Sequence, residues 1–310
     1  MLAVLRPNTG RLIAIGLLLL LLAGCVVVEK TPETPRAAAE RAAPGKGAAA
    51  GKKVALIGVD PGLSGVEPGF PAYYGRNFKA LLEKECPGLM FDAALAADLK
   101  VPPRLVSGLL DGQALAVFGR RQGVEFFLIG TLMDVKLDQK RTGFWLWKDT
   151  RYAIQAVVRV EVVDSATGAK IMDDSQRDEV VIDGLKHEEL QQSQVVRMAD
   201  YQPAMERMLR KSARLTCQAL RDRPWQAFIV AAEGGAIVLS AGSDSGLAAG
   251  QVLEVFGLGA AMVGKDGQRF VPVGEKLGEA TVSAVTRDSA KAVFAGWESV
   301  RSGGTVRMKR

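Results

Sequence analysis

The amino-acid sequence predicts an α+β fold, in which a mixed-sheet α/β sandwich is followed by a small all-β, barrel-like domain. The first observation is the element order of residues 54–222, which is strand, helix, helix, three strands and helix. This order places helices against one sheet. The second is a change at residues 223–310, where short apolar strands are separated by glycine-containing turns. About 255 residues follow the first 53, enough for two modest domains.

The sandwich opens with a strand that is apolar on both faces. Residues 53–60 (KVALIGVD) have the continuous apolar run of a strand buried between two layers. After a loop rich in glycine and proline, residues 72–86 show the spacing of a helix, which Pro87 and Gly88 stop. Residues 111–121 are predicted as a second helix, ended by Gly123.

Three strands are expected to complete the sheet. Residues 125–135 begin apolar on both faces and then alternate, and residues 152–163 return with one apolar face. The segment DSATG (164–168) is a hairpin turn into a last strand over residues 169–182. The side chains expected to face inward on the first two of these strands are Met133, Val135, Leu137, Ile154, Ala156, Val158 and Val160.

The last helix of the sandwich is expected to open at Pro203 and to run to about Arg221. Its inner face comprises Met205, Met208, Leu209, Ser212, Thr216 and Leu220. Its opposite face is basic, with Arg207, Arg210, Lys211, Arg214 and Arg221. Such a stripe is usually a solvated face. The alternative is a docking surface for an acidic partner or for lipid headgroups.

The C-terminal pattern predicts a small β-barrel. Its strands are expected at residues 227–231, 236–240, 252–256, 278–286, 290–294 and 305–309, with a tight turn at 265–268. Gly246 and Gly250 permit positive dihedral angles in a loop, while Val252, Leu253 and Val255 are expected in the core. A loop of this kind can also cradle an anion, but residues 242–250 include no basic side chain.

The N-terminus has the pattern of an export signal. Arg6 and Arg11 precede an apolar run over residues 12–22, which is too short for a bilayer-spanning helix of about 20 residues. The following Leu-Ala-Gly-Cys resembles the lipobox of bacterial lipoproteins. This resemblance implies cleavage between Gly24 and Cys25, so that residues 1–24 are removed and the Cys25 thiol receives a diacylglycerol. An uncleaved helical anchor is the alternative.

By analogy with such lipoproteins, Val26 in place of Asp implies the outer membrane, with the protein facing the periplasm. Residues 25–53 then form the lipidated cysteine and a tether, because residues 29–53 contain no Leu, Ile, Val or aromatic residue. The segment GKGAAAGKK lacks the spacing and the Ser or Thr of a phosphate-binding loop. The whole chain carries +6, and the signal carries two arginines and no acid, so the mature chain carries +4. That mild basicity suits lipid headgroups and does not call for nucleic acid.

Three segments, VALIGVD (54–60), FFLIGTL (126–132) and VRVEVVDSATGAKI (158–171), resemble landmarks of the TolB N-terminal-like fold. Curli secretion lipoproteins (CsgG-type), lipoprotein activators of peptidoglycan synthases and the middle domain of flagellar assembly protein T (FlgT-type) share this fold. IVLSAGSDSGLAAGQVLEVF (237–256) resembles the C-terminal domain of flagellar assembly protein T. The resemblance implies a role in assembling an envelope structure, of flagellar or secretion type.

The stretch KRTGFWLWKDTR (140–151) raises a separate question, because curli secretion channels cross the outer membrane by two hairpins. A crossing strand needs about 9 to 11 residues with one continuously apolar face. Neither register of this stretch satisfies that condition, and residues 170–181 alternate charges on both sides. The tip either folds back onto the sheet, contacts a partner or rests on headgroups. We assign a partner contact to Arg141, Phe144, Trp145, Trp147 and Lys148.

Once Cys25 is lipidated, Cys86 and Cys217 remain as an even pair in an oxidising compartment, each near the end of a predicted helix. Flagellar assembly protein T resembles this chain in having a cysteine near the end of its last middle-domain helix. We expect a Cys86–Cys217 disulfide, with two separate buried thiols as the alternative.

No residue pattern argues for catalysis. His187 is the only histidine and lies in a polar stretch, which argues against both a zinc site and a Ser-His-Asp triad. The carboxylate pairs Asp173-Asp174 and Glu188-Glu189 are expected in solvent. We therefore predict no enzyme, no cofactor and no metal.

The expected role is a non-enzymatic assembly or scaffolding lipoprotein that binds an envelope protein or further copies of itself. A curli-type secretion channel subunit and an activator of a peptidoglycan synthase are the alternatives.

Overall fold

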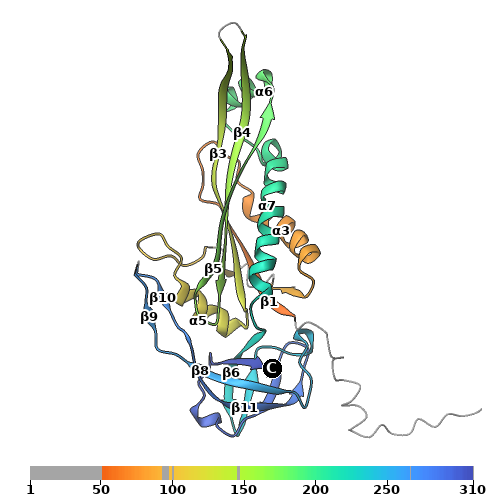
Figure 1. The fold of residues 1–310 in the computed structure, drawn as a ribbon, viewed down its shortest axis with the longest axis vertical. Helices are drawn as coiled ribbons and strands as arrows, with labels where there is room; N and C mark the ends of the chain where they lie inside the picture. The colour runs from red at the N-terminus through yellow and green to blue at the C-terminus, as the bar shows by residue number, and fades with distance from the viewer. Residues whose placement is uncertain (1–50, 93–97, 100, 145–146, 266, 310) are drawn as a thin grey trace, which may run out of the picture. The chain divides into compact units, whose positions relative to one another are not determined.

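The computed structural model describes residues 51–92, 98–99, 101–144, 147–265 and 267–309 (Figure 1). All of them belong to one compact unit that spans Ala42–Arg310. The elements of its first part are β1 (Lys52–Val59), α3 (Phe70–Glu85), β2 (Leu89–Phe91), α5 (Gly112–Gln122), β3 (Phe126–Phe144), β4 (Trp147–Asp164), β5 (Lys170–Ile182), α6 (Gly184–Ser193) and α7 (Met198–Arg221).

The predicted α+β class and mixed sheet are confirmed. The sheet has the order β2-β1-β3-β4-β5, with β1 parallel to both neighbours and the remaining pairs antiparallel. β1 begins at Lys52, one residue before the predicted strand, so Lys52 belongs to the fold and not to the tether. The short strand β2 was not predicted, because three residues carry no periodic signal.

Helices α3 and α7 lie side by side on one face of this sheet, and α5 lies on the other (Figure 1). The larger core is between the sheet and α3 and α7, and its rings include Tyr74, which is completely buried and stacks on Phe78 at 4.8 Å. Gly130 on β3 makes room for Tyr74, since a Cβ at this position would overlap the tyrosine ring. Helix α3 therefore packs close to β3 at Gly130, which has no side chain.

One inward-facing residue was predicted wrongly. Met133 is 45% exposed, whereas Leu132 and Val135 are buried. The β3–β4 register shifts between Leu132 and Asp134, which makes Met133 the extra residue of a β-bulge. Because side chains alternate with a period of two, one inserted residue reverses the faces. The predicted positions on β4 are confirmed, with Ile154, Ala156, Val158 and Val160 all buried.

The start of the last helix was also predicted wrongly. α7 begins at Met198, and Pro203 lies inside it. The Asp200 carboxylate accepts a hydrogen bond from the Arg197 backbone N–H at 2.9 Å, which satisfies a donor at the helix start. Pro203 removes one backbone bond, but the buried face of α7 compensates for it through tertiary packing. That face contains every residue that was predicted for it.

The second part is a closed barrel, and among the described residues its strands have the order β11-β12-β7-β6-β13-β8. They are β6 (Gln226–Glu233), β7 (Ala236–Leu239), β8 (Val252–Leu258), β11 (Val273–Val285), β12 (Ala290–Val293) and β13 (Thr305–Met308), and a two-stranded hairpin comprises β9 (Met262–Val263) and β10 (Arg269–Phe270). Each of the six predicted strand positions corresponds to a barrel strand. Leu253 and Val255 are buried as expected, but Val252 is 36% exposed because it lies on the outward side of the alternation.

Candidate functional site

The first candidate site is the long β3–β4 hairpin, whose two strands pair from Phe126↔Asp164 to Phe144↔Trp147, with one shift of register at Met133. Its contribution to the core ends near Leu137, which is half-buried, and Tyr152. Beyond these positions, Lys140, Arg141 and Arg151 are exposed. We call the segment from Lys140 to Arg151 the distal hairpin. It continues as paired strand, and none of its side chains that the structure describes is buried.

Of the five predicted contact residues, the structure describes the side chain of Arg141, which is exposed. Trp145 lies outside the described residues, and so do the side chains of Phe144, Trp147 and Lys148. The hairpin that carries these residues is confirmed, and the contact itself stays a prediction. Cys25, the predicted lipidation site, and Gly24 also lie outside the described residues. Among those described, no helix is both long enough and apolar enough to cross a bilayer.

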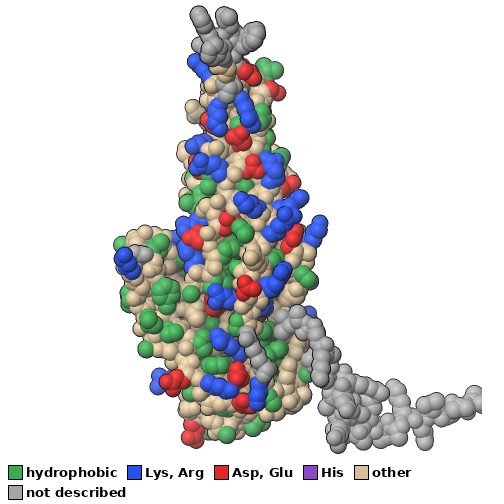
Figure 2. Space-filling model, in the orientation of Figure 1, with side chains coloured by type: hydrophobic (Ala, Val, Ile, Leu, Met, Phe, Trp, Pro, Cys, Tyr) green, Lys and Arg blue, Asp and Glu red, His purple; other side chains and the backbone are tan. Residues whose placement is uncertain are grey.

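The stem of this hairpin carries paired charges on the face that points away from α7. Lys140 contacts Asp138 at 3.2 Å and Glu179 at 3.5 Å, and Arg151 contacts Glu179 at 2.9 Å. The hydrogen bond that Lys140 donates to Asp138 and the nearby charge of Glu179 raise the pKa of Lys140. Exposed pairs of this kind contribute little stability. They make this part of the hairpin a hydrophilic surface, and charged side chains of both signs cover the visible surface of the molecule in Figure 2.

The carboxylates that were considered for catalysis are engaged elsewhere. Arg159 donates to both oxygens of Asp173, at 2.7 and 2.6 Å, and this contact lowers the pKa of Asp173 to about 2. Asp174 accepts from the Ser212 hydroxyl at 2.7 Å on the opposite face of the sheet. Glu189 pairs with Lys186 at 3.2 Å. Asp173 and Asp174 therefore do not form a joint acid–base pair.

His187 occupies a position that the sequence did not predict. The stretch around it forms helix α6, where His187 is buried and its ring stacks on Tyr152 at a centroid distance of 4.2 Å. Within the described ranges, no group of three or more His, Cys, Asp or Glu side chains is arranged to hold a metal ion. His187 thus packs at the end of the core, next to β4, the strand that returns from the distal hairpin.

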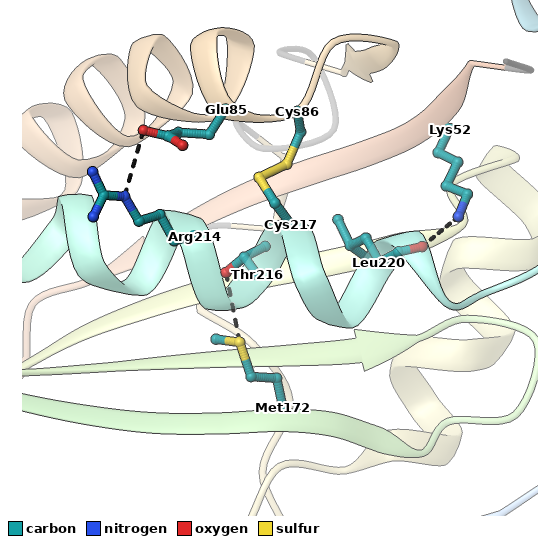
Figure 3. Close-up of a disulfide and its surroundings, with 8 residues drawn as sticks. All are labelled: Lys52, Glu85, Cys86, Met172, Arg214, Thr216, Cys217 and Leu220. Atoms are coloured by element: carbon teal, nitrogen blue, oxygen red, sulfur yellow. Dashed lines mark hydrogen bonds and ion pairs between the residues drawn. A yellow bond between two sulfur atoms is a disulfide. The ribbon is translucent and has the colours of Figure 1, made fainter.

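The second candidate site surrounds the disulfide between Cys86 and Cys217, whose Cα atoms are 5.6 Å apart (Figure 3). The bridge joins the end of α3 to the last turns of α7, as predicted. A cavity of about 320 Å³ borders both cysteines and is also lined by Lys52 and Leu220. The disulfide therefore lies where the two helices converge on the start of the fold.

Lys52 closes the C-terminal end of α7. Its ammonium donates to the carbonyl oxygen of Leu220 (Figure 3). It also donates to the carbonyl oxygen of Arg223, at 2.6 Å. A cation at this position satisfies free carbonyl groups and complements the negative end of the helix dipole. Burial lowers the pKa of Lys52. The point where the predicted tether enters the fold is thus bonded directly to α7.

A buried polar cluster joins the sheet to the first strand of the barrel, and it was not predicted. The Glu125 carboxylate accepts from the backbone N–H groups of Lys53 at 3.0 Å and Gln226 at 3.2 Å. The Gln226 side chain donates to Asp164 at 2.9 Å. Burial raises the pKa of Glu125 to about 8, against the opposing effect of these two hydrogen bonds. One feature of the sequence could have indicated this cluster: Glu125 directly precedes the apolar run FFLIG.

No protein-family model matches the sequence, and no curated protein matches it. Solved structures with partial similarity include hypothetical protein CT253 from Chlamydia trachomatis, with a TM-score of 0.34 and 15% identity over 56% of this chain and 100% of that one. A minor lipoprotein from Acinetobacter baumannii has a TM-score of 0.26 and 11% identity over 55% and 91%. Lipoprotein GNA1162 from Neisseria meningitidis has a TM-score of 0.25 and 12% identity over 46% and 94%. At such scores these similarities carry no conclusion about this chain.

Proposed function

We propose that this chain is a lipid-anchored, non-enzymatic protein of the bacterial cell envelope, which acts in assembly or scaffolding by binding a protein partner or further copies of itself. The observation that carries this proposal is the β3–β4 hairpin, which continues to Phe144↔Trp147 after its buried positions have ended. A paired extension whose described side chains are not buried gives the fold little stability. Its residue types are those of an interface anchor, with aromatic and basic side chains together.

The stem supports a role in water rather than in a bilayer. Its charged pairs around Glu179 and Asp138 lie on the face away from the helices. A lysine or arginine at the middle of a membrane-crossing strand costs about 2 to 4 kcal/mol. A secretion-type pore built from this hairpin is therefore disfavoured. Val26 after the predicted lipidated cysteine supports, by analogy with other lipoproteins, a place on the periplasmic side of the outer membrane.

Loss of the anchor tests the first half of the proposal. We expect Cys25→Ser to leave the protein without lipid and to move it from the membrane fraction to the soluble fraction, because the thiol is the attachment point of the diacylglycerol. Cell fractionation with immunodetection measures this, and metabolic labelling with palmitate reports the lipid directly. Membrane association at the wild-type level in this variant would contradict the anchor.

Truncation of the tip tests the second half. We expect Trp145→Ala combined with Trp147→Ala to leave the melting temperature within a few degrees of wild type and to abolish protein–protein crosslinks formed in cells. The reason is that none of the described side chains of the distal hairpin is buried, whereas removal of a buried Trp costs roughly 3 to 5 kcal/mol. Thermal melting and crosslinking with mass spectrometry provide the two measurements.

The matched control is Met262→Ala with Val263→Ala, which truncates two exposed apolar side chains on a different hairpin of the same chain. It should retain the crosslinks. A fall of many degrees in the melting temperature of the tryptophan variant would show that the tip packs on its own fold. Crosslinks that survive in that variant would show that the tip is not the contact.

A further inference from the structure

The outward face of α7 carries a stripe of basic side chains, Arg207, Arg210, Lys211 and Arg214, which we call the α7 basic stripe. Residues three and four positions apart on a helix are neighbours, so these four form one continuous surface. Together with Pro203 and Glu206 they line a surface hollow of about 410 Å³. Lys and Arg side chains gather over the part of the molecule that α7 occupies in Figure 1 (Figure 2).

The two ends of the stripe are neutralised in part and its middle is not. Arg207 contacts Asp178 at 2.6 Å, and Arg214 lies 3.7 Å from Glu85. Within the part of the chain that the structure describes, Arg210 and Lys211 are exposed and have neither an ion pair nor a side-chain hydrogen bond. Like charges at this spacing repel one another and weaken a helix. An anionic surface placed against the stripe would remove that repulsion.

The packing of α7 fixes the direction in which the stripe points. The opposite face of the helix is buried against the sheet through Met205, Met208 and Leu209, and the disulfide at Cys217 ties it to α3. The helix therefore cannot rotate to pair Arg210 and Lys211 with acids elsewhere in the fold. The stripe is a rigid, permanently outward-facing array of donors.

The stripe is also close to the place where the predicted tether enters the fold. Lys52 is bonded to the carbonyl oxygens of Leu220 and Arg223, at the C-terminal end of α7. At 1.5 Å per residue, the stripe lies on the order of 10 to 20 Å along the helix from this point.

We propose that the α7 basic stripe binds the anionic phospholipid headgroups of the membrane that holds the chain. This inference rests on the lipid anchoring proposed above. The arginine guanidinium presents planar, paired N–H donors that match phosphate oxygens, and the lysine ammonium adds a point charge. Each basic side chain near an anionic membrane surface favours binding roughly fivefold. The stripe would thereby set the orientation of the protein on the membrane, which a single lipid leaves free.

The test uses the whole mature chain with Cys25→Ser, so that the lipid does not mask the contribution of the stripe. The protein is sedimented with vesicles of phosphatidylcholine and with vesicles of phosphatidylcholine and phosphatidylglycerol at low salt. We expect binding to the anionic vesicles at least roughly tenfold stronger than to the neutral ones, and weaker as salt is added. Arg210→Ala with Lys211→Ala should reduce the anionic binding by roughly tenfold or more.

The matched control is Lys291→Ala with Arg301→Ala, which removes the same charge from exposed positions of the barrel. It should bind like the parent, and all variants should share its melting temperature. Equal binding to both vesicle types, or an equal loss in the control, would overturn the proposal. So would unchanged vesicle binding of the stripe variant combined with loss of its protein crosslinks in cells. Fractionation of the lipidated protein reports the anchor independently, so failure of the stripe is distinguishable from failure of the anchor.

Discussion

Replacing Cys86 and Cys217 together by alanine is expected to lower the free energy of unfolding by about 4 to 5 kcal/mol. The bridge closes a loop across a sequence separation of 131, and in the chain-entropy view a long loop loses most freedom in the unfolded state. Alanine is chosen because Cys217 is buried against the apolar core, where a serine hydroxyl would lack a partner. Guanidinium unfolding at neutral pH measures the change.

Wild-type protein treated with dithiothreitol is the control, since it loses the same crosslink without losing either sulfur atom. It should unfold close to the double variant. Two unfolding curves that differ from oxidised wild type by less than about 1 kcal/mol would show that the disulfide does not limit the stability of the α3–α7 pair.

The second large effect concerns the pH dependence of stability that Glu125 produces. Burial holds the pKa of this carboxyl at about 8, against an ordinary value of 4.5. The hydrogen bonds from Lys53 and Gln226 and the charge of Lys52 oppose the increase, while Asp164 adds to it. Between these two pKa values the folded protein holds a proton that the unfolded chain releases. Stability should therefore be full below about pH 4.5 and should fall as the pH rises to about 8.

At about 1.4 kcal/mol for each pKa unit, a displacement from 4.5 to about 8 corresponds to roughly 4 to 5 kcal/mol. Urea unfolding of wild type and of Glu125→Gln, from pH 5 to pH 8, measures it. Both proteins share all other titrating groups, so the difference between them isolates Glu125. We expect the free energy of unfolding of the glutamine variant to increase relative to that of wild type as the pH rises. Parallel stability curves would mean that Glu125 is ionised throughout this range.

Several features of this chain could be predicted because their signals are local. The alternation of apolar residues along one segment predicts both a strand and the face of it that meets the core. The apolar positions are Ile154, Ala156, Val158 and Val160, and all four side chains are buried. The inner face of α7 follows in the same way from a period of 3.6. Glycine-punctuated short strands predicted the barrel. The two cysteines narrowed the possibilities to a bridge or two thiols, and the structure contains the bridge.

Other features depended on long-range packing. The bulge at Met133 is a shift in the pairing of β3 with β4, and the alternation of residues along β3 alone does not show it. Pro203 is tolerated inside α7 because the helix packs on the sheet, although local rules place proline at a helix start. His187 is buried because Tyr152, 35 residues earlier in the chain, stacks on its ring.

The candidate site shows the same division between sequence and structure. Composition alone singled out the aromatic and basic residues of the distal hairpin and the basic face of α7. The structure decided that α7 cannot turn, that Lys52 closes its end, and that Glu125 is buried between the sheet and β6. The pattern of apolar and polar residues along one helix or strand predicts which of its side chains are buried. Which distant backbone donor or ring a buried charge will meet depends on the packing of all the elements together, and only the folded chain specifies it.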